Sequence, residues 1–131
     1  MRGEADGRLL RLAAPISFWG GVDPITGCVC DPRHPDYGNC ISHRVLAIGA
    51  TIGSSSSSAI MLELLRNGTA PAALLLARHD AILVLGVLVA RELGYPTIPV
   101  VELTSAALAG LPTEGDATVN EDGTLRFTPP S

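Results

Sequence analysis

The chain has 131 residues, of which 47% are hydrophobic and 17% charged, and its formal net charge is −4. This length suits one domain with one core, and the apolar content is too high for a disordered chain. The nine Lys and Arg residues are scattered along the chain, which argues against an electrostatic nucleic-acid surface. We therefore expect residues 1–131 to form a single domain that binds no nucleic acid.

Targeting signals and cysteines bear on where the protein works. The N-terminal residues mix charges and lack the apolar segment of a signal peptide. The longest nearly unbroken apolar stretch, residues 81–90, is about half of what a membrane span needs. Both features predict a soluble, cytoplasmic protein. An odd number of cysteines without a secretion signal predicts reduced thiols at Cys28, Cys30 and Cys40.

The first half of the chain reads mainly as strands and loops. We expect a first strand over residues 8–18. Because Pro15 has no amide hydrogen for the ladder of a sheet, this strand should lie at a sheet edge or be kinked. A loop and a short strand over residues 27–31 follow, and then a second loop with two prolines. Residues 44–50 form an unbroken apolar run, which is typical of a buried strand.

The second half alternates helices and strands. Apolar spacing predicts a helix over residues 56–67, ended by Asn67-Gly68, and then a buried strand over 72–77. A second helix, capped by Asp80 and running to about residue 93, is apolar on most sides and should be buried.

The remaining elements are a strand, a short helix and a hairpin. We expect a strand over residues 97–101, a short helix over 104–111, and a terminal hairpin from 117–119 and 124–127. The whole order predicts an α/β domain with a mixed sheet or a partly closed barrel, two main helices and a C-terminal hairpin.

The segment from Gly53 to Ser58, a glycine and five serines, joins a predicted strand to a predicted helix. The first amides of a helix lack internal partners and lie at the positive end of its dipole, so this loop could hold a carboxylate or phosphate. A serine here could also act as a base if its alkoxide were stabilised. The alternative is a helix cap with extra polar residues.

Several strings of the sequence, taken together, resemble the small subunit of aconitase X. The strings are SFWGGVDP at 17–24, Thr26-Gly27, His34-Pro35, Gly38, GSSS at 53–56, NGTAPA at 67–72 and PTIPV at 96–100. The resemblance implies a swivelling β/β/α domain, like the mobile fourth domain of aconitase. It also implies a heterodimer with a large subunit that carries the cysteine ligands of an iron–sulfur cluster or an iron centre.

The resemblance further implies a hydro-lyase, inactive without the large subunit. Its substrate would be cis-3-hydroxy-L-proline, giving Δ1-pyrroline-2-carboxylate, or mevalonate 5-phosphate. The implied proton acceptor is Ser54, with metal polarising the departing hydroxyl, while Gly53, Ser55 and Ser56 hold the carboxylate. Aconitase has an arginine where Ser56 stands, which disfavours a tricarboxylate. The unbroken serine run favours the hydroxyproline substrate.

Other polar residues have two interpretations each. Cys28-x-Cys30, near Cys40, His34 and His43, could bind a metal, but the spacing lacks the two-residue knuckle and we expect no metal here. His34 either contacts the substrate or the partner, or is a solvated loop residue. His43 and, further along the chain, His79 are expected at the surface.

Three residues near the first glycine pair complete the candidates. Asp23 could bind a substrate ammonium, although capping its own Asp-Pro turn is favoured. For Phe18 and Trp19, a place in the core is favoured over a subunit interface. Besides the dehydratase subunit, two functions remain open: a non-catalytic module that binds a carboxylate or phosphate, and a regulatory subunit whose serines only cap a helix.

Overall fold

A computed structural model describes residues 4–12, 14, 16–49, 56–77, 81–112, 115–122 and 124–128. Six strands form one sheet in the order β4-β3-β2-β1-β5-β6. The strands are β1 (Ala5–Arg11), β2 (Val45–Ile48), β3 (Ala73–Leu76), β4 (Val100–Glu102), β5 (Asp116–Val119) and β6 (Leu125–Thr128). The helices are α1 (Phe18–Gly21), α2 (Ser56–Asn67), α3 (Ala81–Glu92) and α4 (Ser105–Ala109).

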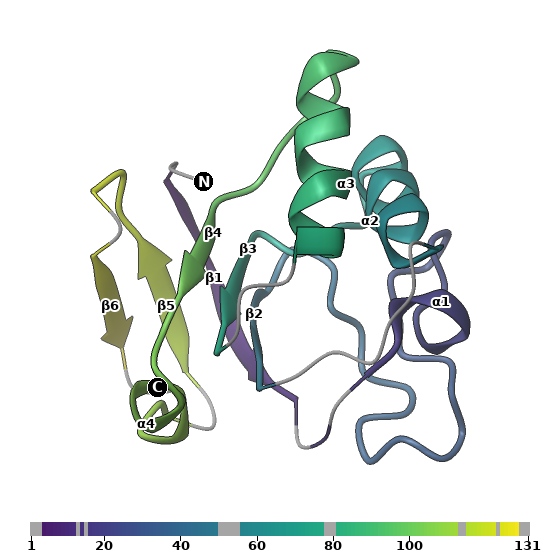
Figure 1. Ribbon diagram of the computed structural model, residues 1–131. Coiled ribbons are helices and arrows are strands. Elements are labelled where there is room, and N and C mark those ends of the chain that lie inside the picture. The colour runs from purple at the N-terminus through teal and green to yellow at the C-terminus, as the bar shows by residue number, and fades with distance from the viewer. Residues whose placement is uncertain are drawn as a thin grey trace.

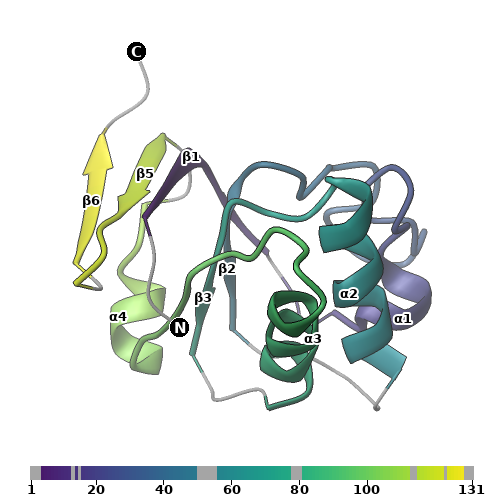
Figure 2. The same ribbon diagram turned by 90° about the horizontal axis from the view of Figure 1, so that it is seen from above.

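The sheet is mixed and curled, which confirms the predicted fold class. Strands β1 to β4 run parallel, whereas β5 pairs antiparallel with β1 and with β6. Helices α1, α2 and α3 cover one side of the sheet, and α4 lies on the other side beside the β5–β6 hairpin (Figures 1 and 2). The curled sheet is thus a half-barrel whose two faces are both covered.

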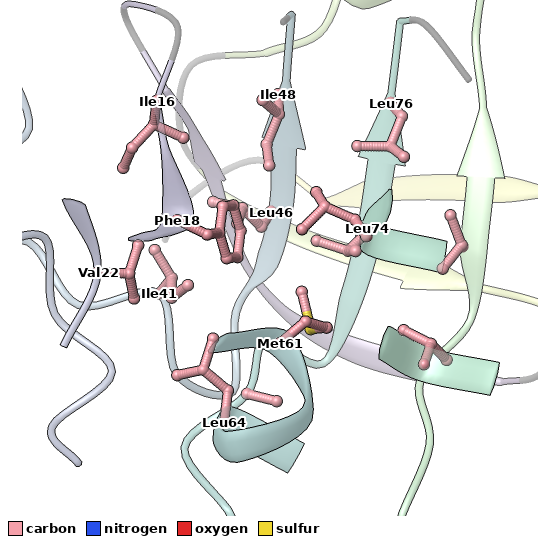
Figure 3. Close-up of a cluster of buried hydrophobic side chains, with 14 of the residues drawn as sticks. Ile16, Phe18, Val22, Ile41, Leu46, Ile48, Met61, Leu64, Leu74 and Leu76 are labelled. Carbon is pink, nitrogen blue, oxygen red and sulfur yellow. The ribbon is translucent and has the colours of Figure 1, made fainter. Parts of the chain in front are cut away.

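Strand β2 is apolar throughout because both faces of the sheet are covered at this strand. Leu46 and Ile48 belong to the cluster beneath α2 and α3, while Val45 and Ala47 belong to the cluster on the other face. Because successive side chains of a strand point to opposite faces, a strand buried on both sides shows no polar alternation. Figure 3 shows Met61 of α2 facing Leu46 of β2 and Leu74 of β3.

Helix α2 begins and ends where the sequence predicted. Its inner face carries Met61, Leu64 and Leu65, all of them buried. Gly68 ends the helix with a φ of 72°, and the amide of Thr69 donates to the carbonyl of Leu64 at 3.0 Å. This left-handed ending is the one that glycine favours, because a Cβ at that φ would be strained.

Helix α3 departs from the prediction that it would be buried. Its inner side, with Leu83 and Val87, is fully buried, but Leu85, Leu88 and Val89 are 51%, 41% and 37% exposed. The helix packs on α2 along one side, and its opposite side faces solvent in this chain. Sequence hydropathy alone could not reveal this, because it does not count the neighbours available to cover a helix.

Three other expectations about the elements need correction. Strand β1 ends at Arg11, and residues 27–31 form isolated bridges instead of a regular strand, because their amides pair with loop carbonyls. Strand β4 starts at Val100 and not at 97. The terminal hairpin and the short helix α4 are confirmed. Within the described residues, no helix is long and apolar enough to cross a membrane.

Candidate functional site

The strand and the helix that flank the serine run meet a sheet edge that suits ligand binding: β2 ends there and α2 begins there. The carboxyl ends of β1 to β4 lie at the same edge, and in open α/β sheets ligands bind outside that edge. The loop follows β2, which lies between β1 and β3 in the sheet. Gly53, Ser54 and Ser55 lie outside the described residues, and of Ser56 the backbone is described as the first residue of α2.

The elements on either side of the loop are held firmly. At the end of β2, the amide of Leu12 donates to the carbonyl of Ala47 at 3.0 Å, and that of Ala77 donates to Ile48 at 3.2 Å. Helix α2 packs on the sheet through Met61 and Leu64 (Figure 3). Its positive end therefore has a fixed position at the carboxyl edge.

The electrostatics of this helix end favour an anion. Its first turn contains no acidic residue, so no side chain of that turn opposes the positive end of the helix dipole. The first amides of a helix have no intrahelical acceptor and can donate to an oxyanion. The arrangement can therefore bind a carboxylate or a phosphate.

His34 lies in the protein interior and not in solvent, so the interpretation as a solvated loop residue is wrong. Its Nδ1 accepts from the amide of Asp36 at 3.0 Å, and its Nε2 lies 3.0 Å from the carbonyl oxygen of Ala14. With Nδ1 accepting from Asp36, Nε2 is the ring nitrogen left to donate to the carbonyl oxygen of Ala14. The ring thus ties its loop to the segment after β1. A substrate contact by His34 stays a prediction.

The loop that carries His34 has further internal hydrogen bonds, one of them at Asp31. The amide of Arg33 donates to Oδ1 of Asp31 at 3.0 Å, and this bond lowers the pKa of the Asp31 carboxyl below its usual range. Together with the bonds of His34, it stabilises the turn that faces the segment after β1.

The region around α1 settles two other interpretations. Oδ1 of Asp23 accepts from the amide of Ile25 at 2.9 Å, which confirms the turn. Phe18 is 1% exposed, so its place in the core is confirmed (Figure 3). Trp19 is 63% exposed, so the same interpretation is wrong for that residue. The helix kinks at Trp19, whose φ and ψ are not helical, and this turns its side chain outward.

The prediction of reduced thiols is wrong for two of the three cysteines. Cys28 and Cys40 form a disulfide, and the isolated antiparallel bridge between them places the two residues opposite each other. Cys30 is free and exposed, and its Sγ lies 3.5 Å from the carbonyl oxygen of Gly20. Among the described residues, no three His, Cys, Asp or Glu side chains gather as a metal site.

Sequence reasoning missed one residue of the serine run. Ser57 is 4% exposed, and its Oγ has no hydrogen-bond partner in the part of the chain that the structure describes. In the sequence it was one of five serines, and no local pattern distinguishes it from its neighbours. Burial of Ser57 depends on how α2 packs against the sheet.

Known proteins of two kinds are similar in sequence to this chain. The chain is 46% identical over 103 residues to the cis-3-hydroxy-L-proline dehydratase of Hypocrea jecorina, an overlap that covers 79% of the chain and 17% of that protein. It is 37% identical to the phosphomevalonate dehydratase small subunit of Methanothermobacter thermautotrophicus, covering 96% of the chain and 93% of that protein.

A solved structure is similar over nearly the whole chain. It is the holo-form crystal structure of aconitase X from Thermococcus kodakaraensis, with a TM-score of 0.84 and 28% identity. The likeness covers 98% of this chain and 92% of that chain. The family model of the aconitase X swivel domain matches residues 1–127. This chain therefore belongs to the aconitase X swivel domain family.

Proposed function

We propose that this chain is the small subunit of a hydro-lyase that dehydrates a small hydroxy acid, most specifically cis-3-hydroxy-L-proline. The observation that carries the proposal is the position of the two elements that flank the serine run in the sequence: β2 ends, and the positive end of α2 lies, at the carboxyl edge of the sheet. The 46% identity to a cis-3-hydroxy-L-proline dehydratase supports this substrate. The chain spans 17% of the length of that relative, so the remaining machinery must come from elsewhere.

The chain's own part in the reaction is to bind the carboxylate and to accept a proton. The backbone of Gly53 and Ser56 and the hydroxyl of Ser55 hold the substrate carboxylate at the start of α2. Oγ of Ser54 takes the proton from the carbon next to that carboxylate, and the hydroxyl leaves from the neighbouring carbon. The helix dipole stabilises the deprotonated serine, as it stabilises other anions at a helix N-terminus.

A large subunit completes the site in this proposal. A relative of nearly the same length is named a small subunit, which supports a larger partner. The iron–sulfur cluster or iron centre that the resemblance implies is assigned to that partner, because the described residues here form no donor set for it. The disulfide removes Cys28 and Cys40 as ligands.

Mevalonate 5-phosphate is the second candidate substrate. The observation in its favour is that the match covers 93% of the phosphomevalonate dehydratase small subunit, which is therefore similar in size to this chain. The first turn of α2 would suit a phosphate as well as a carboxylate. Turnover of the two substrates by the same complex distinguishes them.

The test uses the complex of this chain with its large subunit, prepared without oxygen, and compares wild type with Ser54→Ala. We expect wild type to dehydrate cis-3-hydroxy-L-proline and Ser54→Ala to lose at least about 1,000-fold in kcat with intact assembly, as when an essential base is removed. The control is Ser42→Ala, since Ser42 precedes β2 at the opposite edge of the sheet. It should keep wild-type kcat.

Three results would contradict the proposal. Turnover retained by Ser54→Ala would remove that serine as the base. An isolated chain that binds the hydroxy acid tightly, with no large subunit in its native host, would favour a non-catalytic binding module. Loss of stability alone, about 1 kcal/mol, would indicate that the serines only cap α2.

A further inference from the structure

Three cysteines lie within one short segment, and two of them form an accessible disulfide. Cys28 and Cys40 are bonded to each other, and Cys40 is exposed while Cys28 is half-buried. Cys30 is a free and exposed thiol. Among protein disulfides, the exposed ones are reduced more readily, and they are the labile and regulatory ones. The accessibility of this bond therefore points to a reactive disulfide and not to a purely structural one.

The backbone holds Cys28 and Cys40 opposite each other independently of the covalent bond. The two residues are partners in an isolated antiparallel bridge. Next to them, the amide of Val29 donates to the carbonyl of Asn39 at 2.8 Å. Residues directly opposite in an antiparallel pair have Cβ atoms about 4.5 to 5.5 Å apart. The reduced thiols should therefore stay close enough to form the bond again.

Cys30 is not an equivalent partner for Cys40. Val29, between the two cysteines of the C-x-C sequence, is 1% exposed, so Cys28 and Cys30 lie on the opposite, outward side of this segment. Cys30 is diagonal to Cys40, and diagonal neighbours in such a pair are about 7 to 8 Å apart. A disulfide requires Cα atoms at most about 7 Å apart. Bonding is therefore selective for Cys28 and Cys40.

The disulfide closes the base of a loop, residues 29–39, that packs on α1. The amide of Cys30 donates to the carbonyl of Gly21 at 2.9 Å. His34, near the tip of the loop, bonds to Ala14. Helix α1 in turn packs against α2 (Figures 1 and 2). Opening the disulfide leaves hydrogen bonds as the ties of this loop, so the base of the loop and α1 become more mobile.

We propose that Cys28 and Cys40 are a reversible thiol–disulfide exchange site, which a dithiol reductant opens and which sets the mobility of the loop base and of α1. A thiolate of the reductant attacks Sγ of Cys40, the more exposed cysteine of the pair. The bond between the two cysteines breaks, and its electron pair goes to Sγ of Cys28. The second thiolate of the reductant then attacks the mixed disulfide and releases Cys40.

This exchange balances without any group from another subunit. The dithiol is oxidised to a disulfide, the cysteine pair is reduced, and the two protons of the dithiol end on Cys28 and Cys40. A small-molecule disulfide reverses the reaction. Each step takes place on this chain, so the exchange site is independent of the proposed dehydratase function.

The first test is the rate at which dithiothreitol reduces the wild-type chain, measured by alkylation and mass spectrometry and compared with the rate in the urea-unfolded chain. We expect the native rate to lie within about 100-fold of the unfolded rate, because the bond is reached without unfolding. A disulfide reached only by global unfolding would be slowed about 1,000-fold or more by the unfolding equilibrium. A slowing of that size, or a wild-type chain without the bond, would overturn the proposal.

The second test measures mobility by NMR order parameters of the backbone amides in the native chain. In the oxidised chain, we expect values of about 0.85 for Gly38, Asn39 and Cys40, as for rigid backbone, and a fall toward about 0.6 after reduction. The amides of β3 should keep about 0.85 in both states. Unchanged values around Cys40 would show that the bond does not control the loop.

Reversibility and selectivity are tested by removing dithiothreitol and adding oxidised glutathione. We expect peptide mapping to find the bond between Cys28 and Cys40 again, together with the higher order parameters. A bond to Cys30 instead, or no bond regained, would contradict the exchange site.

Two variants complete the test. Cys40→Ser should show the low order parameters with or without reductant. Cys30→Ser is the matched control, because it removes a thiol two residues from Cys28 and leaves the pair intact. It should respond to dithiothreitol as wild type does, and loss of that response would show that Cys30 takes part in the bond. If Cys40→Ser does not fold, the comparison of oxidised with reduced wild type decides.

Discussion

The close approach of α3 to α2 makes Gly86→Ala a sharp test of the packing beneath the site. In an exposed helix, this change stabilises by about 1 kcal/mol, because alanine is the better helix former. Here a Cβ on Gly86 would lie 2.6 Å from the carbonyl oxygen of Ser58 and 3.0 Å from Cβ of Met61. The first of these atoms is backbone and cannot rotate away.

The expected effect follows from these two opposing contributions. Overpacking of a core costs about 1 to 3 kcal/mol, and a contact with backbone lies at the upper end of that range. After the gain in helix propensity, we expect a net destabilisation of about 1 to 2 kcal/mol. The helices must separate at the first turn of α2, so the same variant should also lower kcat in the complex.

Urea unfolding of the chain, followed by circular dichroism, measures this change. The control is Gly110→Ala at the end of α4, where φ is −83° and the nearest atoms would lie 3.5 and 3.6 Å from the new Cβ. Nothing there must move, so stability should stay unchanged or rise by up to about 1 kcal/mol. If Gly86→Ala also stabilised the chain, the close packing of α3 on α2 would be refuted.

Three further variants test other parts of the structure by the same unfolding assay. His34→Ala should cost about 1 to 2 kcal/mol, because it leaves the partly buried carbonyl of Ala14 without its donor, and a loss below about 0.5 kcal/mol would contradict the ring's bonding. Reduction of the disulfide, or Cys28→Ser, opens a loop of sequence separation 12 and should lower the free energy of unfolding by about 3 kcal/mol. An unchanged free energy of unfolding would show that the bond to Cys40 is absent. Leu64→Ala, at a fully buried position, should cost about 2 to 5 kcal/mol.

Much of the fold could be predicted because its signals are local. The apolar spacing and the Asn67-Gly68 stop predicted α2 with the right ends, and alternation with a turn predicted the terminal hairpin. The serine run could be assigned to a strand–helix junction for the same reason. These features depend on residues within a few positions of one another, where chain geometry restricts the possible contacts.

The strand boundaries were harder to predict because pairing partners decide them. Apolar content alone extended the first strand to residue 18, whereas β1 stops at Arg11, where pairing with β2 ends. Residues 27–31 carry strand-like side chains, but their amides bond to loop carbonyls. A segment becomes a strand only where a neighbouring backbone lies alongside it.

By itself, the sequence determined the class of fold, the family resemblance and the serine loop at the start of α2, because these lie in short contiguous strings. Only the tertiary structure decided which groups are covered. It joined Cys28 to Cys40 and His34 to Ala14, exposed one side of α3, and buried Ser57 without a partner among the described residues. Burial depends on contacts between segments distant in the chain, and spacing within one segment does not specify them.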